Sequence, residues 1–171
     1  MKIKLFCFAA LLTALTTTIT AQNSQKYFGD HCVGNWKGTM LMYNDGILSD
    51  SVAVLFEVSK IENEDNWIWR TTYQTAAKEI IKDYILKLED AEKGQYIIDE
   101  KDGILLNCFQ VENKLFSIFS VGENLLTAIY QITDEQIIFE VTSGKKEQAT
   151  GDGTISNYSI NHLQKVVLKK I

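Results

Sequence analysis

Side chains that commonly carry catalysis or bind metals are scarce in this sequence. The chain has two histidines, His31 and His162, and three cysteines, Cys7, Cys32 and Cys108. The histidines lie far apart in the sequence and no Cys-x-x-Cys pair is present, so the ligand spacing typical of a zinc site is missing. We therefore predict no metal site and no resident cofactor.

Carboxylates gather between residues 89 and 102. Paired carboxylates can transfer protons or bind calcium, but these flank predicted turns and lack the Asp-x-Asn-x-Asp-Gly spacing of a calcium loop. The sequence also has no Gly-x-Ser-x-Gly nucleophile elbow and no glycine-rich phosphate loop. We therefore predict a solvated acidic hairpin and a protein that is not an enzyme. The carboxylates are Glu89, Asp90, Glu92, Asp99, Glu100 and Asp102.

Cys32 and Cys108 are the two cysteines outside the first 21 residues. In an exported protein such a pair permits a disulfide. Cys108, however, lies in an apolar predicted strand, where a free buried cysteine is common. A sequence supplies no distance between two sulfur atoms, so both interpretations stay open.

Aromatic side chains are the candidates for a binding pocket. Trp36 and Met40 share one face of a predicted strand, and Trp67, Trp69 and Tyr73 share one face of another. If these faces point into a barrel, the rings either line a cavity for a small molecule or stack into a solid core. The predicted pocket-wall residues are Trp36, Met40, Trp67, Trp69, Tyr73, Phe119 and Phe139.

The N-terminal segment has the layout of a secretory signal peptide. Lys2 and Lys4 precede an apolar run at 5–15, and the small residue Ala21 stands at the predicted cleavage point. An uncleaved anchor is the alternative, but the run is shorter than the about 20 residues of a membrane span. We predict a signal peptide over 1–21, a lead-in over 22–33 and a β-barrel domain over 34–171. The product is then exported to the periplasm or the extracellular space.

The rest of the chain alternates short apolar, β-branched and aromatic segments with turn residues. A length of 171 residues predicts one domain, and a net charge of −5 argues against nucleic-acid binding. Short turns favour strands that pair in sequence order. We therefore predict an all-β fold, a single antiparallel up-and-down meander barrel of about 8–10 strands. The expected strands are 35–43, 51–59, 67–74, 80–89, 95–99, 104–111, 115–121, 125–133, 136–142 and about 158–170.

Several of these strands are apolar on both faces, at 104–106, 115–116, 125–126 and 137–138. A barrel wall that meets water on its outer side normally alternates apolar and polar residues. Part of the outer wall is therefore covered or meets a partner, or else it carries scattered exposed apolar residues, as many proteins do. The oligomeric state does not follow from this pattern.

Gly34 and Trp36 form a Gly-x-Trp motif at the start of the first expected strand. With this motif the chain resembles the calycins, which include lipocalins, fatty-acid-binding proteins and nitrobindin-like barrels. The resemblance implies that Trp36 plugs one end of the barrel and that Lys169 or Lys170 packs over it. The Thr-Asp-Tyr motif of lipocalins is absent.

Over residues 34–168 the chain is similar to small exported barrels of bacterial envelopes that have no established function. The similarity rests on Gly34 to Gly38, on the aromatic residues of 67–73 and on the run from Gly94 to Ile104. It implies an architecture and no catalytic residues. Nitrobindin-like barrels bind haem through a histidine near the start of the last strand, and His162 has a similar place.

The sequence therefore predicts an exported, non-catalytic protein that binds a small apolar or amphipathic ligand inside a calycin-like barrel. Two alternatives remain. One is a structural or protein-interaction module with a packed barrel core. The other is a haem-binding, nitrobindin-like barrel that uses His162.

Overall fold

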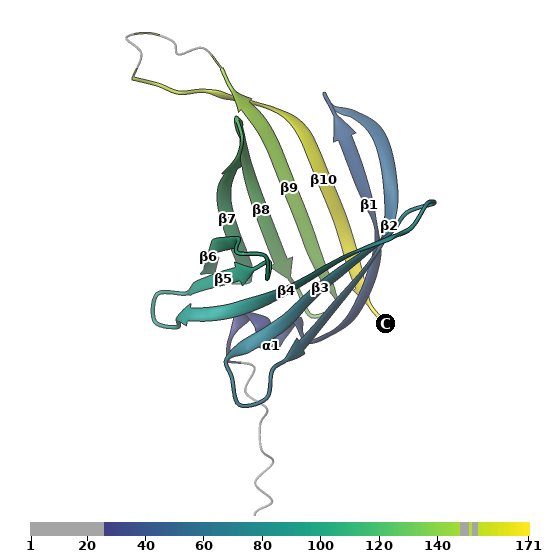
Figure 1. The fold of residues 1–171 in the computed structure, drawn as a ribbon, viewed down its shortest axis with the longest axis vertical. Helices are drawn as coiled ribbons and strands as arrows, with labels where there is room; N and C mark the ends of the chain where they lie inside the picture. The colour runs from purple at the N-terminus through teal and green to yellow at the C-terminus, as the bar shows by residue number, and fades with distance from the viewer. Residues whose placement is uncertain (1–25, 148–150, 152–153) are drawn as a thin grey trace, which may run out of the picture.

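The computed structural model describes residues 26–147, 151 and 154–171, so the predicted signal peptide lies outside the described residues. Ten antiparallel strands pair in sequence order, and β10 pairs with β1 to close a barrel (Figure 1). The predicted all-β meander barrel is confirmed. The strands are β1 (Gly34–Asn44), β2 (Ile47–Lys60), β3 (Asn66–Gln74), β4 (Glu79–Asp90), β5 (Gln95–Asp99), β6 (Leu105–Val111), β7 (Lys114–Val121), β8 (Asn124–Ile132), β9 (Gln136–Lys146) and β10 (Tyr158–Lys170).

Tight turns explain why each strand pairs with the next. Between β1 and β2, Asp45 and Gly46 both have positive φ angles, 49° and 78°. A two-residue turn of this kind matches the right-handed twist of the two strands that it joins. Neighbouring strands therefore pair locally, and only the β1–β10 contact joins residues from the two ends of the domain.

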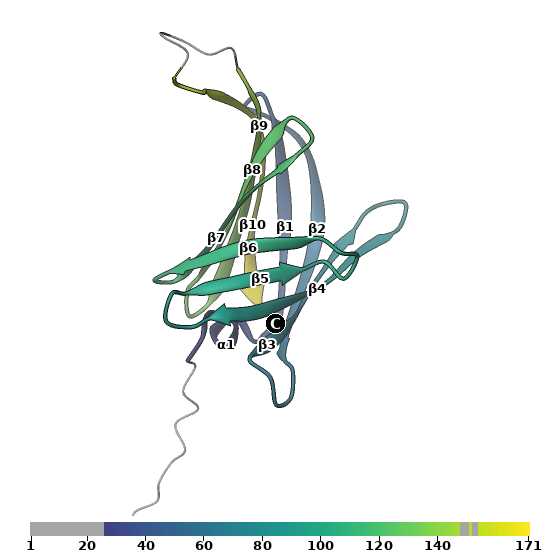
Figure 2. The same cartoon turned by 60° about the vertical axis from the view of Figure 1, so that its left-hand side comes forward.

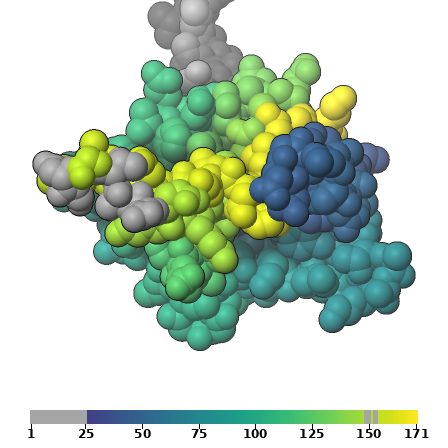
Figure 3. All heavy atoms as spheres, turned by 90° about the horizontal axis from the view of Figure 1, so that it is seen from above, coloured from purple at the N-terminus to yellow at the C-terminus, as the bar shows by residue number. Residues whose placement is uncertain are grey.

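The barrel has two unlike ends. Strands β4–β6 cross the other strands at a steep angle in Figure 2. The closed end carries the short helix α1 (Phe28–Cys32) and the turns at 61–65, 91–94, 112–113 and 133–135. The open end carries the turns at 45–46, 75–78, 100–104 and 122–123. Figure 3 looks onto the open end, where the β1–β2 hairpin (blue) stands beside β10 (yellow) and the β3–β4 hairpin (teal) lies apart.

Helix α1 falls within the segment that the sequence predicted as a lead-in. Five residues make little more than one helical turn, so no apolar stripe could reveal the helix from its periodicity. Its side chains Phe28 and Cys32 are buried against the barrel core. The backbone N–H of Phe28 donates to the hydroxyl of Tyr96, 3.1 Å away, which ties the helix to β5.

Asp30 connects α1 to the strands around it. Trp67 Nε1 donates a hydrogen bond to Asp30 Oδ1 over 3.1 Å, and Lys60 Nζ lies 3.2 Å from the same oxygen. The other carboxylate oxygen accepts the backbone N–H of Tyr27 at 3.2 Å. One carboxylate thus fixes the start of the helix and satisfies a buried indole N–H.

Trp36 closes the barrel from the β1 side. Its indole Nε1 donates to the carbonyl of Cys32 over 2.8 Å, and its ring is 1% exposed. Lys170 Nζ lies 5.2 Å from the centre of the Trp36 ring, which confirms the expected basic residue over the plug. Lys170 also packs against Gly34. The φ angle of Gly34, 140°, and the nearby Lys170 side chain both disfavour a larger residue at this position.

Among the residues that the structure describes, no helix is long and apolar enough to cross a membrane.

Packing between α1 and β3 gives the first prediction. A Cβ atom at position 29 would overlap the indole ring of Trp67, because Gly29 lies directly against that ring. Gly29→Ala should therefore lower the free energy of unfolding by roughly 1–3 kcal/mol. Urea unfolding followed by tryptophan fluorescence measures the change. His31→Ala, on the exposed side of the same helix, is the control, and equal effects of the two substitutions would contradict this packing.

Candidate functional site

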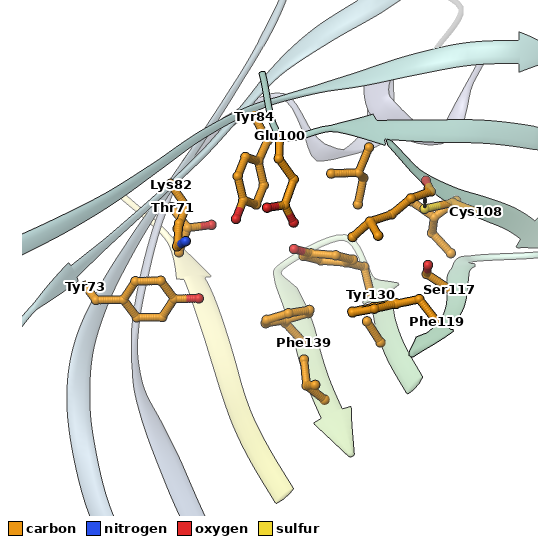
Figure 4. A pocket seen from close by; sticks show the side chains of 15 residues that line it. Thr71, Tyr73, Lys82, Tyr84, Glu100, Cys108, Ser117, Phe119, Tyr130 and Phe139 are labelled. Carbon is orange, nitrogen blue, oxygen red and sulfur yellow. Dashed lines mark hydrogen bonds between the residues drawn. The ribbon is translucent and has the colours of Figure 1, made fainter. Parts of the chain in front are cut away.

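A cavity of about 160 Å³ lies inside the barrel on the side of the open end. Side chains from β3 to β9 reach into it, and strands β1, β2 and β10 contribute none (Figure 4). Its lining residues are Thr71, Tyr73, Lys82, Tyr84, Ile98, Glu100, Leu106, Cys108, Leu115, Ser117, Phe119, Ala128, Tyr130, Phe139 and Val141.

Aromatic rings form the apolar wall of this cavity. Tyr130 and Phe139 stack with their ring centres 4.2 Å apart, and Tyr130 meets Trp69 edge-on at 5.2 Å. Such contacts hold the rings in defined orientations and stabilise each pair by about 0.5–1.5 kcal/mol beyond their burial. The cavity wall is therefore continuous with the packed core, and its shape is largely set in advance.

Four polar side chains gather at one side of the cavity, and we call them the polar mouth: Tyr73, Lys82, Tyr84 and Glu100. Figure 4 shows the Glu100 carboxylate between the hydroxyls of Tyr84 and Tyr130, while the Tyr73 hydroxyl points toward the same space. Glu100 is half-buried and Lys82 is exposed. An apolar cavity with a few convergent polar groups is the usual form of a small-molecule site.

Burial controls the protonation of the tyrosines in this site. Burial raises the pKa of Tyr84, and the negative charge of Glu100 raises it further. Burial also raises the pKa values of Tyr73 and Tyr130. These phenols therefore stay protonated near neutral pH and can each donate one hydrogen bond. The polar mouth thus offers hydroxyl donors together with one carboxylate acceptor.

A groove of about 570 Å³ adjoins the cavity at the open end, and we call it the open-end groove. It shares Tyr73 and Lys82 with the cavity, so these two side chains lie at the junction. Its other walls include Met42 and Val52 from β1 and β2. The groove gives the cavity a route to solvent and room for a longer part of a ligand.

The structure separates the predicted pocket-wall residues into two groups. Tyr73, Phe119 and Phe139 line the cavity. The other four lie elsewhere: Met40 borders the open-end groove, and Trp36, Trp67 and Trp69 belong to the packed core near α1. The three tryptophans do not line this cavity, because they pack against helix α1. Trp36 also borders a separate surface groove of about 490 Å³ at the closed end.

Of the polar mouth, the sequence predicted Tyr73 as a pocket-wall residue but not the other three residues. Lys82 and Tyr84 continue the inward face of Leu86, and Glu100 continues that of Tyr96 and Ile98, so the period of two was a usable signal. Glu100 was instead interpreted as part of a solvated acidic hairpin. Asp90 and Asp102 are not cavity residues, whereas Glu100 follows β5 on the face of Tyr96 and Ile98 and lines the cavity.

The two cysteines remain separate. Cys32 and Cys108 are both free and buried, so the disulfide that the sequence permitted is not formed in the structure. Burial raises the pKa of the Cys108 thiol to about 11 and raises that of Cys32 as well. Both thiols therefore stay protonated at neutral pH. In this form a cysteine packs as a small apolar side chain.

His162 does not reach the cavity. It lies on β10, where it is exposed and pairs in register with Asn44 of β1. Neither the cavity nor the open-end groove includes it among its lining residues. The described residues also contain no group of three His, Cys, Asp or Glu side chains placed to bind a metal ion. The arrangement therefore does not fit an axial haem ligand inside the barrel.

The sequence matches no known protein family and no curated protein. Solved structures share its fold. The S-type phycobiliprotein lyase of Guillardia theta aligns with a TM-score of 0.59 and 8% identity, over 84% of this chain and 90% of the lyase. A protein of unknown function from the DUF3598 family of Nostoc punctiforme gives the same score and identity, and the chain spans about half of it, 49%. At such low identity these likenesses show a common barrel fold.

Proposed function

We propose that this protein binds a small amphipathic molecule, with the apolar part in the cavity and the polar part at the polar mouth. The observation that carries the proposal is the placement of Glu100 and the tyrosine hydroxyls over a wall of stacked rings (Figure 4). Partial burial of a carboxylate is unfavourable because the group loses hydration. A barrel that served only as a packed core would therefore not be expected to place Glu100 here. The Gly34–Trp36 plug under Lys170 supports a calycin-like relationship of this barrel.

The size of the cavity limits the apolar part of the ligand. A cavity of about 150 Å³ in a protein core holds one benzene molecule, and the cavity here measures about 160 Å³. It therefore accepts one ring or a short branched chain. Any longer portion would lie in the open-end groove.

Binding without catalysis is the proposed activity, although one structural relative is a lyase by name. No histidine is among the cavity-lining residues. The thiol and the serine hydroxyl in the lining are poorly suited as nucleophiles: Cys108 has a pKa of about 11, and Ser117 Oγ donates to the carbonyl of Asn107 at 2.8 Å. An activated nucleophile needs an adjacent base or a lowered pKa.

Filling the cavity should weaken ligand binding. Ala128→Leu adds three carbon atoms to the cavity wall, so it should weaken binding of a one-ring ligand such as 2-phenylethanol by roughly tenfold or more. Isothermal titration calorimetry measures the affinity. Ala91→Leu makes the same change in an exposed turn at the closed end and serves as the control. Unchanged affinity in Ala128→Leu would place the ligand outside this cavity.

We further propose that the protein is exported, because residues 1–21 carry the charge and apolar pattern of a signal peptide. Secretion from a bacterial host should yield a product whose first residue is Gln22. N-terminal sequencing of the mature protein checks the cleavage point. A product that retains Met1 and stays inside the cell would contradict export.

A specific observation favours an interaction surface as a second function. Strands β6 and β7 pair only over Phe109–Val111 and Lys114–Phe116, and a surface groove of about 520 Å³ lies along them. Phe109 is 50% exposed and Ile118 is 69% exposed beside it. Exposed apolar surface of this kind commonly marks a protein contact.

This second function makes a separate prediction. If two copies meet through the outer face of β6 and β7, light scattering should show a dimer at micromolar concentration. The substitution Ile118→Lys should convert it to a monomer, because it places a charge in the contact. A monomer at every concentration tested would remove self-association as the role of this face.

A further inference from the structure

Glu100 has no cationic partner within the described part of the chain. Two lysines near it in the sequence pair with other carboxylates. Lys101 Nζ lies 2.9 Å from Asp83, and Lys87 Nζ lies 2.7 Å from Asp99. Glu100 thus lines the cavity without an ion-pair partner among the described residues.

A half-buried carboxylate such as Glu100 is energetically unfavourable without a binding partner. Its side chain is half-buried, and its polar neighbours in Figure 4 are the hydroxyls of Tyr84 and Tyr130. A carboxylate that loses water needs a counter-charge or several hydrogen-bond donors. Lys82, the other charged residue of the polar mouth, is exposed and forms no described ion pair with Glu100. A cationic group beside Glu100 would therefore stabilise this carboxylate.

Aromatic faces surround the same space. Tyr73, Tyr84, Tyr130 and Phe139 all line the cavity, and Figure 4 shows their side chains on several sides of the Glu100 carboxylate. Aromatic rings attract ammonium groups through their quadrupole, most strongly where water is excluded. Lys82 Nζ lies 6.0 Å from the Tyr84 ring, so a cation is already tolerated against this wall. The carboxylate and the aromatic rings would therefore both attract a cationic ligand.

We propose that the ligand is a small ammonium compound, a protonated amine attached to one ring or a short apolar chain, with Glu100 as its counter-ion. This inference rests on the binding function proposed above and specifies its ligand class. The ring occupies the wall formed by Phe139 and Tyr130, and the ammonium group lies at the polar mouth between Glu100 and Tyr84. Lys82 opposes the ammonium group from the side of the open-end groove.

Three one-ring probes of similar shape test the charge preference. They are 2-phenylethylamine, which is protonated at pH 7, the neutral 2-phenylethanol and the anionic phenylacetate. Isothermal titration calorimetry on the full protein should show the amine binding roughly tenfold more tightly than the alcohol, with phenylacetate weakest. This order requires a negative site, because the three probes present nearly the same apolar surface.

Two substitutions assign the preference to the polar mouth. Glu100→Gln should lower the amine affinity by roughly tenfold, to near that of the alcohol, and should lower the alcohol affinity much less, because a neutral hydroxyl keeps an amide oxygen as its acceptor. Lys82→Met should strengthen amine binding, because it removes the opposing charge and keeps an apolar stem. Glu123→Gln is the matched control, since Glu123 is exposed at the open end and lies outside the cavity lining. Thermal unfolding of each variant verifies that it is folded.

The outcomes separate this inference from the function on which it rests. Equal affinity for amine and alcohol, or amine affinity that survives Glu100→Gln, would overturn the ammonium ligand and leave ligand binding standing. Tightest binding of phenylacetate that is lost in Lys82→Met would also overturn it, in favour of an anionic ligand. If none of the three probes bound, the proposed binding function itself would fail.

Discussion

The seating of helix α1 on Trp67 is the contact on which the rest of the barrel depends. Asp30 accepts the indole hydrogen bond of Trp67, pairs with Lys60 and accepts a backbone N–H at the start of the helix. Removing that carboxylate would leave a buried indole N–H without a partner, at a cost of about 1–3 kcal/mol. Helix α1 packs against the core at the closed end, and the aromatic-lined cavity lies toward the open end.

A continuous chain of aromatic contacts connects helix α1 to the cavity wall. Phe28 of α1 lies 6.4 Å from Trp69, Trp69 lies 5.2 Å from Tyr130, and Tyr130 stacks on Phe139 at 4.2 Å, all measured between ring centres. The rings that hold the core together are therefore neighbours of the rings that would contact a ligand. Interiors packed at this density transmit small shifts, so stability and the shape of the cavity are linked in this barrel.

Charge is distributed differently on the two sides of the barrel wall. On the outer side, Asp83 lies 2.9 Å from both Arg70 and Lys101, whose hydrogen bonds and charges hold its pKa below the usual range. Pairs of this kind meet water and contribute little to stability. On the inner side, Glu100 lies beside aromatic rings without such a partner among the described residues. This contrast between a paired outer wall and an unpaired inner carboxylate is what suggests a ligand.

The sequence by itself determined the class of fold and the positions of the strands. The period of two and turn residues such as Asp45 and Gly46 act locally, so they predicted ten strands, several with the observed limits within a residue or two. The Gly34–Trp36 motif likewise indicated a plug under a terminal lysine. The strands could be predicted because they depend on residues that are close in sequence and on the simple inside–outside rule, whereas the lysine over Trp36 was implied only by the resemblance to calycins.

Only the tertiary structure decided which inward side chains meet a cavity. Trp36, Trp67 and Tyr73 all face inward, yet the tryptophans contact α1 and the tyrosine contacts open space. The difference comes from a five-residue helix too short to show a periodicity. The sequence likewise predicted a solvent-exposed Glu100, whereas in the closed barrel this residue lies beside Tyr84 and Tyr130. A strand pattern gives the direction of a side chain, but what lies opposite it depends on strands and a helix far away in the sequence.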